Sequence, residues 1–210
     1  YEGLGRCYNE VINLSRGELT ANSVEFSDGK NSYFIFHKAP GDNPKPTILY
    51  LPGMDAVKED YPNPFSNDYT KRGINICAMD GPGQGEYNIN GVWQDGHNYA
   101  IAAEKVVDWL ISRDDVDGDK IAVFGTSMGS RWGVQIAAHD PRVKAVVGQM
   151  ANVGTFDIIF EQAQPNFKRI FMYMAGYSDE DEFDEFIQRL DRLPDLAKKV
   201  TVPHLLVAGD

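Results

Sequence analysis

Short apolar runs of strand length recur along the chain. They occupy residues 47–51, 74–79, 121–124, 143–147 and 204–208 and are rich in Val, Ile, Leu and Phe. These runs lack the polar alternation of a strand with one wet face, and continuous runs of this kind are typical of strands buried on both faces of a parallel sheet. The pattern therefore predicts five buried strands.

Segments with helical spacing separate several of these runs. Residues 99–111 carry an apolar residue at every third or fourth position, as in a helix that packs on a core. Residues 63–72 and 131–138 are also compatible with helices, and residues 1–14 form a short helix or a loop. Strands that alternate with helices predict an α/β fold: a mainly parallel sheet with helices on both faces.

The sequence predicts two further local structures, a hairpin and a turn, ahead of buried strands. Apolar and polar residues alternate in residues 23–26 and 33–38, which flank the turn-rich sequence S-D-G-K-N. This pattern predicts a β-hairpin. The polar stretch at 114–119 predicts a turn before the strand at 121–124.

Residues 152–199 interrupt the alternation and are too long for a simple crossover. The first half is rich in Phe, Tyr and Met, and the second half is an acidic amphipathic stretch. One interpretation is a helical cap over the carboxyl edge of the sheet, where ligands bind in such folds; the other is extra core packing without contact to a substrate. The expected organisation is a core at 1–151, a cap at 152–199 and a further core strand at 200–210.

Composition restricts the partners. The formal net charge is −11, and because binding to nucleic acid relies on basic surface, we expect no nucleic-acid partner. The six carboxylates at 178–185 are typical of a solvated helix face. No apolar run approaches the roughly 20 residues that span a membrane, and the first residues do not resemble a signal peptide. The sequence therefore predicts a cytoplasmic protein with no membrane partner.

The two cysteines do not indicate a disulfide framework or a zinc site. Cys7 and Cys77 lie far apart, and Cys77 falls within an apolar run, as a buried thiol does. We therefore expect no metal ion.

The sequence G-T-S-M-G at 125–129 follows the strand at 121–124 directly and leads into the helix at 131–138. A strand, a sharp turn and a helix with Ser127 at the turn are the context of a nucleophile elbow, in which small neighbours let the strand and helix approach each other. The alternative is a structural Gly-Ser turn. We predict that Ser127 is the catalytic nucleophile.

Attack on a carbonyl also needs N–H donors for the developing oxyanion. One is expected from the backbone of Met128, the residue after the nucleophile, and the other from a loop after an earlier strand. The sequence L-P-G-M-D at 51–55 is that loop, and we nominate the N–H of Met54, with Gly53 letting the backbone turn. The alternative is an ordinary turn at the end of a strand.

The glycine-rich sequence D-G-P-G-Q-G-E at 80–86 lacks the Lys-Ser/Thr of a phosphate-binding P-loop, and the Rossmann spacing fails as well. Its expected role is a tight loop at the carboxyl edge of the sheet. Together with L-P-G-M-D, the Lys58-Glu59 pair and G-x-S-x-G, in this order, it resembles the α/β-hydrolase fold. Within that fold the chain is similar to the branch of dihydroxypseudooxynicotine hydrolase, fermentation-respiration switch esterase-like proteins and fungal polyketide-shortening hydrolases, over residues 47–210.

The resemblance implies serine hydrolysis, without a cofactor, of small-molecule esters or of carbon–carbon bonds next to a ketone. Members tend to carry an extra helical region before the core and to form homodimers. Glu59 matches the family's acidic stretch past the oxyanion loop, where a carboxylate could orient the substrate; a solvated or salt-bridged surface acid is the alternative. Asp55 is a second candidate for contact with substrate.

The order of the triad in this fold is Ser, acid, His. The acid is expected just past the strand at 204–208, which makes Asp210 a candidate, although we expect the true acid and the histidine beyond the residues given. The four histidines present, at 37, 97, 139 and 204, are assigned structural roles, with His97 the nearest to a substitute base. Two hypotheses follow. In the first, the chain is a C-terminally incomplete serine hydrolase that is nearly inactive by itself; in the second, it is a catalytically silent binding module. A lyase that uses the oxyanion hole is a third class of function.

Overall fold

In a computed structural model of the protein, residues 2–152, 154–156, 159–160, 164–190 and 192–209 are described. Seven strands in this part of the chain form one sheet with the order β1-β2-β4-β3-β5-β6-β7. The strands are β1 (Leu19–Ser27), β2 (Lys30–His37), β3 (Lys45–Leu51), β4 (Asn75–Met79), β5 (Val116–Thr126), β6 (Val143–Gln149) and β7 (His204–Val207). The helices are α1 (Glu2–Leu14), α2 (Asp68–Lys71), α3 (Gly85–Ile89), α4 (Asn98–Ile111), α5 (Met128–His139), α6 (Pro165–Ala175), α7 (Glu180–Gln188) and α8 (Leu193–Ala197).

The sheet is mainly parallel, as predicted. Strands β4, β3, β5, β6 and β7 run parallel to one another, whereas β1 and β2 form the predicted hairpin and β2 pairs antiparallel with β4. Because β3 lies between β4 and β5, segments far apart in the sequence end side by side at one edge of the sheet.

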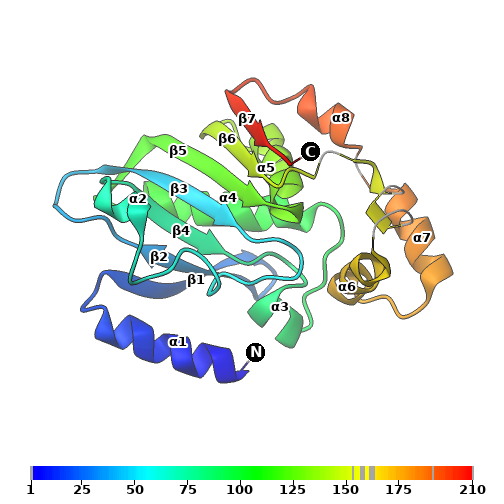
Figure 1. The fold of residues 1–210 in the computed structure, drawn as a ribbon, viewed down its shortest axis with the longest axis horizontal. Helices are drawn as coiled ribbons and strands as arrows, with labels where there is room; N and C mark the ends of the chain where they lie inside the picture. The colour runs from blue at the N-terminus through cyan, green and yellow to red at the C-terminus, as the bar shows by residue number, and fades with distance from the viewer. Residues whose placement is uncertain (1, 153, 157–158, 161–163, 191, 210) are drawn as a thin grey trace.

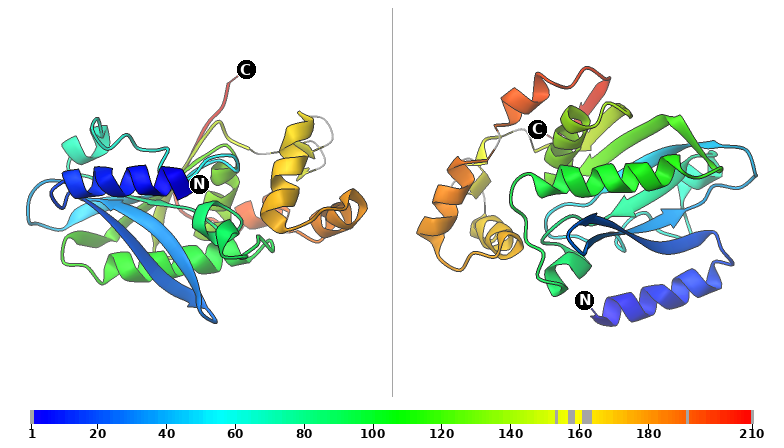
Figure 2. Two further views of the ribbon diagram at one scale, coloured as in Figure 1. Left: turned by 90° about the horizontal axis from the view of Figure 1, so that it is seen from below. Right: turned by 180° about the vertical axis from the view of Figure 1, so that it is seen from behind.

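Helices lie on both faces of the sheet (Figures 1 and 2). Helices α4 and α5 pack on one face, and α1 and α2 lie on the other. All five residues of β4 are buried, which explains why this strand is a continuous apolar run. The α/β prediction is therefore confirmed.

Two local predictions need correction. The helix expected at 63–72 is reduced to the four residues of α2, because the Oδ1 of Asn67 accepts from the N–H groups of Tyr69 (3.1 Å) and Thr70 (3.3 Å) and so starts the helix there. The turn expected at 114–119 is in part the beginning of β5, since Lys45 of β3 pairs with Val116.

Helices α6, α7 and α8 belong to residues 164–190 and 192–199, hereafter the helical segment. Helices α6 and α7 stand beyond the carboxyl ends of the parallel strands (Figure 1). Their docking on the core involves a hydrogen bond from the N–H of Gln94 to the carbonyl of Met174 (2.9 Å). A Cβ on Gly83 would lie only 2.3 Å from that same carbonyl oxygen, so the loop after β4 and α6 are in direct backbone contact.

Among the described residues, none of the helices has the length and apolar character that crossing a membrane requires.

Candidate functional site

Ser127 lies on a sharp turn between β5 and α5. Its backbone has φ 53° and ψ −120°, a conformation that costs a residue with a side chain roughly 1–3 kcal/mol. The N–H of Ser127 donates to the carbonyl of Gln149 in β6 (2.9 Å), and its own carbonyl accepts from the N–H and the hydroxyl of Ser130 (3.0 and 2.6 Å). The next strand and the first turn of α5 thus hold the strained turn in place.

Two glycines let β5, α5 and β3 come together around this turn. A Cβ on Gly125 would lie 2.1 Å from the carbonyl oxygen of Gly129, and a Cβ on Gly129 would lie 2.3 Å from the carbonyl oxygen of Leu51. Neither position has room for any other residue. The spacing of the glycines around Ser127 therefore follows from backbone packing.

The loop after β3 lies beside Ser127. Leu51 pairs with Gly125 in the parallel register, so the residues after Leu51 are level with the turn. A Cβ on Gly53 would lie 3.4 Å from the Cβ of Ser127 and 3.2 Å from Oδ1 of Asp55. The structure therefore brings together Ser127, the start of α5 at Met128, and residues 53–55, which include the predicted Met54 and Asp55.

Gln84 fastens this loop to the glycine-rich segment after β4. Its Nε2 donates to the carbonyls of Gly53 (2.8 Å) and Ala56 (3.0 Å), while its Oε1 accepts from the N–H of Gly81 (3.0 Å) and the hydroxyl of Tyr99 (3.3 Å). The side chain is 3% exposed, so water does not compete for these bonds. This role was not predicted from the sequence, although a long amide side chain among glycines was a signal for it.

An ion-pair cluster surrounds Lys58, buried at Glu59 and Asp80 and open to solvent at Glu86. Its Nζ lies 3.0 Å from Glu59, 3.1 Å from Asp80 and 2.7 Å from Glu86. Burial raises the pKa of Asp80 to about 6, an effect that the nearby Lys58 opposes. Burial, with the charge of Glu59 nearby, raises the pKa of Tyr8 in α1 to about 12. Glu59 is thus salt-bridged and lies toward α1, and its contact with substrate stays a prediction.

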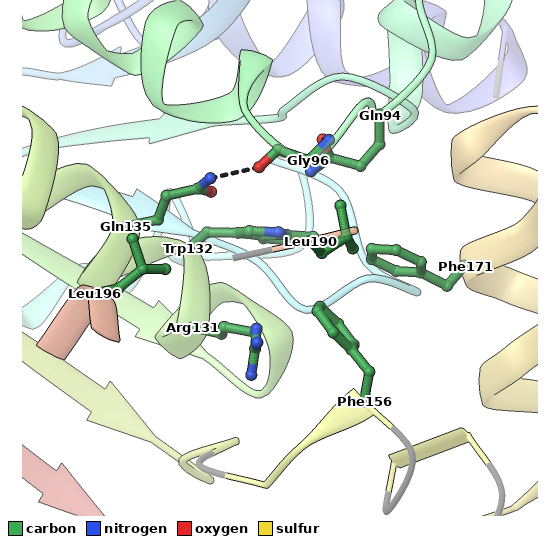
Figure 3. A pocket seen from close by; sticks show the side chains of 9 residues that line it. All are labelled: Gln94, Gly96, Arg131, Trp132, Gln135, Phe156, Phe171, Leu190 and Leu196. Carbon is green, nitrogen blue, oxygen red and sulfur yellow. Dashed lines mark hydrogen bonds between the residues drawn. The ribbon is translucent and has the colours of Figure 1, made fainter. Parts of the chain in front are cut away.

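A cavity lies between α5 and part of the helical segment (Figure 3). Arg131 and Trp132 line it from α5, and Phe171 lines it from α6. Arg131 is only 5% exposed. Its Nη1 donates to the carbonyl of Gly154 (3.0 Å), and its guanidinium carbon lies 4.0 Å from the ring centre of Phe156. The sequence analysis missed Arg131; its signal was a charged residue in an otherwise apolar part of the helix.

His37 and His139 contact residues other than Ser127. His37 is buried, which lowers its pKa to about 4, and its Nδ1 lies 3.5 Å from the amide of Asn67. His139 pairs with Glu104 at 2.7 Å.

The remaining two histidines lie at the start of an element. His97 precedes α4 and lines a groove with His139, and His204 begins β7 with its side chain exposed. Asp210, the candidate acid, lies outside the described residues. Within the described ranges, no three His, Cys, Asp or Glu side chains are grouped closely enough to bind a metal ion.

Solved structures with a similar fold include hydrolases. 2,6-Dihydroxy-pseudo-oxynicotine hydrolase superposes with a TM-score of 0.84 at 22% identity, over 95% of this chain and 55% of that chain. AbyA5 superposes with a TM-score of 0.79 at 18% identity, over 98% of this chain and 60% of that one. At these identities the likeness establishes the fold.

Sequence comparison identifies a family. Esterase FrsA of Escherichia fergusonii is 29% identical over 145 residues, which are 67% of this chain and 34% of that protein. Esterase FrsA of Salmonella newport is 30% identical over the same shares. The chain thus spans about a third of the length of these relatives. The profile of FrsA-like esterases matches residues 4–176, which is most of the chain. The chain belongs to the family of FrsA-like esterases.

Proposed function

We propose that the protein containing this chain is a serine hydrolase that cleaves a carboxylic ester or a carbon–carbon bond next to a ketone. The observation that carries the proposal is the strained turn at Ser127, with φ 53° between two glycines that permit no side chain. Backbone strain of this kind persists where function requires the geometry. A turn that served only to connect β5 with α5 would not need it.

In the proposed reaction, Oγ of Ser127 adds to the substrate carbonyl carbon while its proton passes to a base. The carbonyl oxygen becomes an oxyanion, which the N–H groups of Met54 and Met128 stabilise. The N–H of Met128 is at the first turn of α5, where helical N–H groups have no partner within the helix. Collapse of the adduct expels an alkoxide, or an enolate in a carbon–carbon cleavage, and this leaving group takes up the proton from the base. Water then releases the acid and restores Ser127.

The base and the acid are proposed to come from parts of the protein outside this chain. His37 and His139 contact Asn67 and Glu104, respectively, and neither arrangement resembles a Ser-His pair. The helical segment, beyond the carboxyl ends of the strands, is proposed to act as a cap over the substrate, and Asp55 to contact the substrate next to Ser127.

Fluorophosphonate labelling of the full-length protein tests the proposal. We expect a covalent adduct on the peptide that carries Ser127, and hydrolysis of p-nitrophenyl esters that falls at least about a thousand-fold in Ser127→Ala. Ser112→Ala is the matched control, because Ser112 is exposed and its hydroxyl donates to the carbonyl of Trp109 at the end of α4. Failure of Ser127 to label in a folded full-length protein would contradict the proposal and favour a catalytically silent module. The observation that favours a silent module is that His37 and His139 contact Asn67 and Glu104.

A further inference from the structure

A groove lies between the loop after β3, α3 and α6. Met54 and Val57 line it from the loop, Ile89 lines it from α3, and Ile170 and Met174 line it from α6. It encloses about 850 Å³, counting the side that is open to solvent. Cavities of this size bind small molecules, so the groove has room for a substrate.

The groove reaches the candidate nucleophile through Met54. Met54 is buried and directly follows Gly53, where an added Cβ would lie 3.4 Å from the Cβ of Ser127. The N–H of Met54 is also the proposed donor to the oxyanion. The groove thus begins at the residue where the proposed reaction holds the substrate carbonyl.

Polar side chains in the walls of the groove have partners within the protein. The amide of Gln84 bonds to the loop after β3 and to the N–H of Gly81. Oδ1 of Asn88 accepts from the hydroxyl of Tyr173 (2.7 Å), and this bond joins α3 to α6, which lie side by side (Figures 1 and 2). The surface that remains for a ligand is therefore mainly apolar.

Two large side chains with apolar surface are exposed along the groove. Ile89 is 54% exposed and Tyr173 is 64% exposed, and exposed apolar surface of this kind is typical of a ligand-binding groove. Among the described residues that line the groove, Asp55 is the one with a charged side chain. Because this carboxylate and the net charge of −11 repel anions, the groove favours an uncharged ligand.

We propose that this groove binds the hydrocarbon chain of the substrate: the protein acts on uncharged carbonyl compounds with an apolar chain. The carbonyl lies at Met54, and the chain packs against Ile89, Ile170 and Met174. This substrate class rests on the proposed serine hydrolysis, whereas binding of an uncharged apolar molecule in the groove does not require hydrolysis.

Titration with 2-octanone and 2-butanone, followed by NMR, tests the proposal. In the full-length protein carrying Ser127→Ala, we expect 2-octanone to bind about ten- to fifty-fold more tightly than 2-butanone, since its longer chain leaves water in the groove. Octanoate has as many carbons as 2-octanone but carries a negative charge. It should bind at least about five-fold more weakly than 2-octanone, because the groove offers a carboxylate and not a cation.

Substitutions at the exposed wall locate the binding. Ile89→Ser changes the last residue of α3 and should reduce the preference for 2-octanone about three- to ten-fold. Ile111→Ser is the matched control, because Ile111 is the exposed last residue of α4, and it should retain the preference. Ile89→Ser combined with Tyr173→Ser should leave a preference of less than about three-fold. All positions changed are exposed, and thermal unfolding checks that the variants fold.

The two proposals can fail separately. Equal binding of the two ketones, tighter binding of octanoate than of 2-octanone, or a preference that survives the double substitution overturns the groove as the substrate site. A labelled Ser127 with any of these results keeps the hydrolase and rejects the groove. A length preference that depends on Ile89 without labelling of Ser127 keeps the groove and rejects the hydrolase. In the active protein, both proposals together predict that Ile89→Ser lowers kcat/KM for p-nitrophenyl octanoate more than for p-nitrophenyl acetate.

Discussion

The side chain of Gln84 helps to determine the backbone geometry beside Ser127, the proposed nucleophile. Gln84 reaches from the segment after β4 to two carbonyls of the loop after β3, and the backbone of Gly53 in that loop lies next to Ser127. The position of the proposed oxyanion donor at Met54 therefore depends on an amide that takes no part in the chemistry. A search for catalytic motifs does not find residues of this type.

Gln84→Met should remove these bonds at nearly constant volume. The Ala56 carbonyl would then lose its Gln84 donor and the N–H of Gly81 its Gln84 acceptor, while the Gly53 carbonyl would keep the N–H of Ala56 (3.2 Å). These losses cost about 2–4 kcal/mol in the free energy of unfolding. Urea unfolding measures this loss, and fluorophosphonate labelling of Ser127 in the full-length protein should slow in parallel. Gln164→Met is the control, because Gln164 is exposed before α6 and its side chain makes no capping bond. Equal effects of the two changes would show that Gln84 does not hold the loop.

Asp80 should make its own contribution to the dependence of stability on pH. The pKa of Asp80 is about 6 in the folded protein, above the ordinary value of 3.8 for an aspartate. Between these two pH values the folded protein keeps a proton that the unfolded chain has lost. The stability that Asp80 contributes should therefore fall as the pH rises from about 4 to about 6 and stay constant above. The free energy of unfolding of the native protein, minus that of Asp80→Asn, measures it over this range. A difference that is flat or rises with pH would contradict the assignment, and Asp68→Asn, at an exposed position in α2, is the control.

At the scale of elements, two glycines show how the helical segment is attached to the core. Gly83 touches the carbonyl of Met174 in α6, and Gly176, which ends α6, packs on the ring of Trp93. These contacts join α6 to the segment between β4 and α4, which includes α3 and also carries Gln84. The helical segment and the loop beside Ser127 are thus mechanically connected.

Gly83→Ala should separate α6 from the core. Gly83 and Gly91 both have positive φ, 87° and 68°, but a Cβ at Gly83 meets the Met174 carbonyl at 2.3 Å, whereas a Cβ at Gly91 meets nothing within 4 Å. Gly91→Ala therefore reports the backbone strain alone. We expect Gly83→Ala to cost about 1–3 kcal/mol more in the free energy of unfolding and to increase proteolysis within residues 164–199. Similar stability and proteolysis of the two variants would rule out direct docking through Gly83.

For the whole molecule, the sheet and the candidate nucleophile could be predicted from the sequence because each rests on a local pattern. Continuous apolar runs mark the buried strands, and G-x-S-x-G after such a run marks the turn at Ser127. The roles of Gln84 and Arg131 depend on contacts with residues far away in the sequence, at Gly53 and Gly154. No local pattern reports such contacts. The short α2 was missed for a different reason, since the capping bond at Asn67 competed with helical periodicity.

The whole chain also allows a prediction about activity. The described histidines at 37 and 139 are engaged elsewhere, so the 210-residue chain alone should hydrolyse p-nitrophenyl acetate only slowly, with the residual rate that an oxyanion hole and binding provide. Ser127→Ala should change that rate little compared with its effect in the full-length protein. Fast hydrolysis by the 210-residue chain that disappears in Ser127→Ala would reveal a base within it.

The close contact between Gly129 and the Leu51 carbonyl has a consequence for how such a site can be transferred between proteins. Tyr50 and Thr126, at the ends of the two strands involved, are 76 residues apart and joined by a 3.3 Å hydrogen bond. A grafted peptide with only β5, the turn and α5 would lack the backbone against which the turn is pressed and would be free to relax. Transplanting the turn at Ser127 into another scaffold therefore requires β3 and the loop that follows it to be transplanted as well.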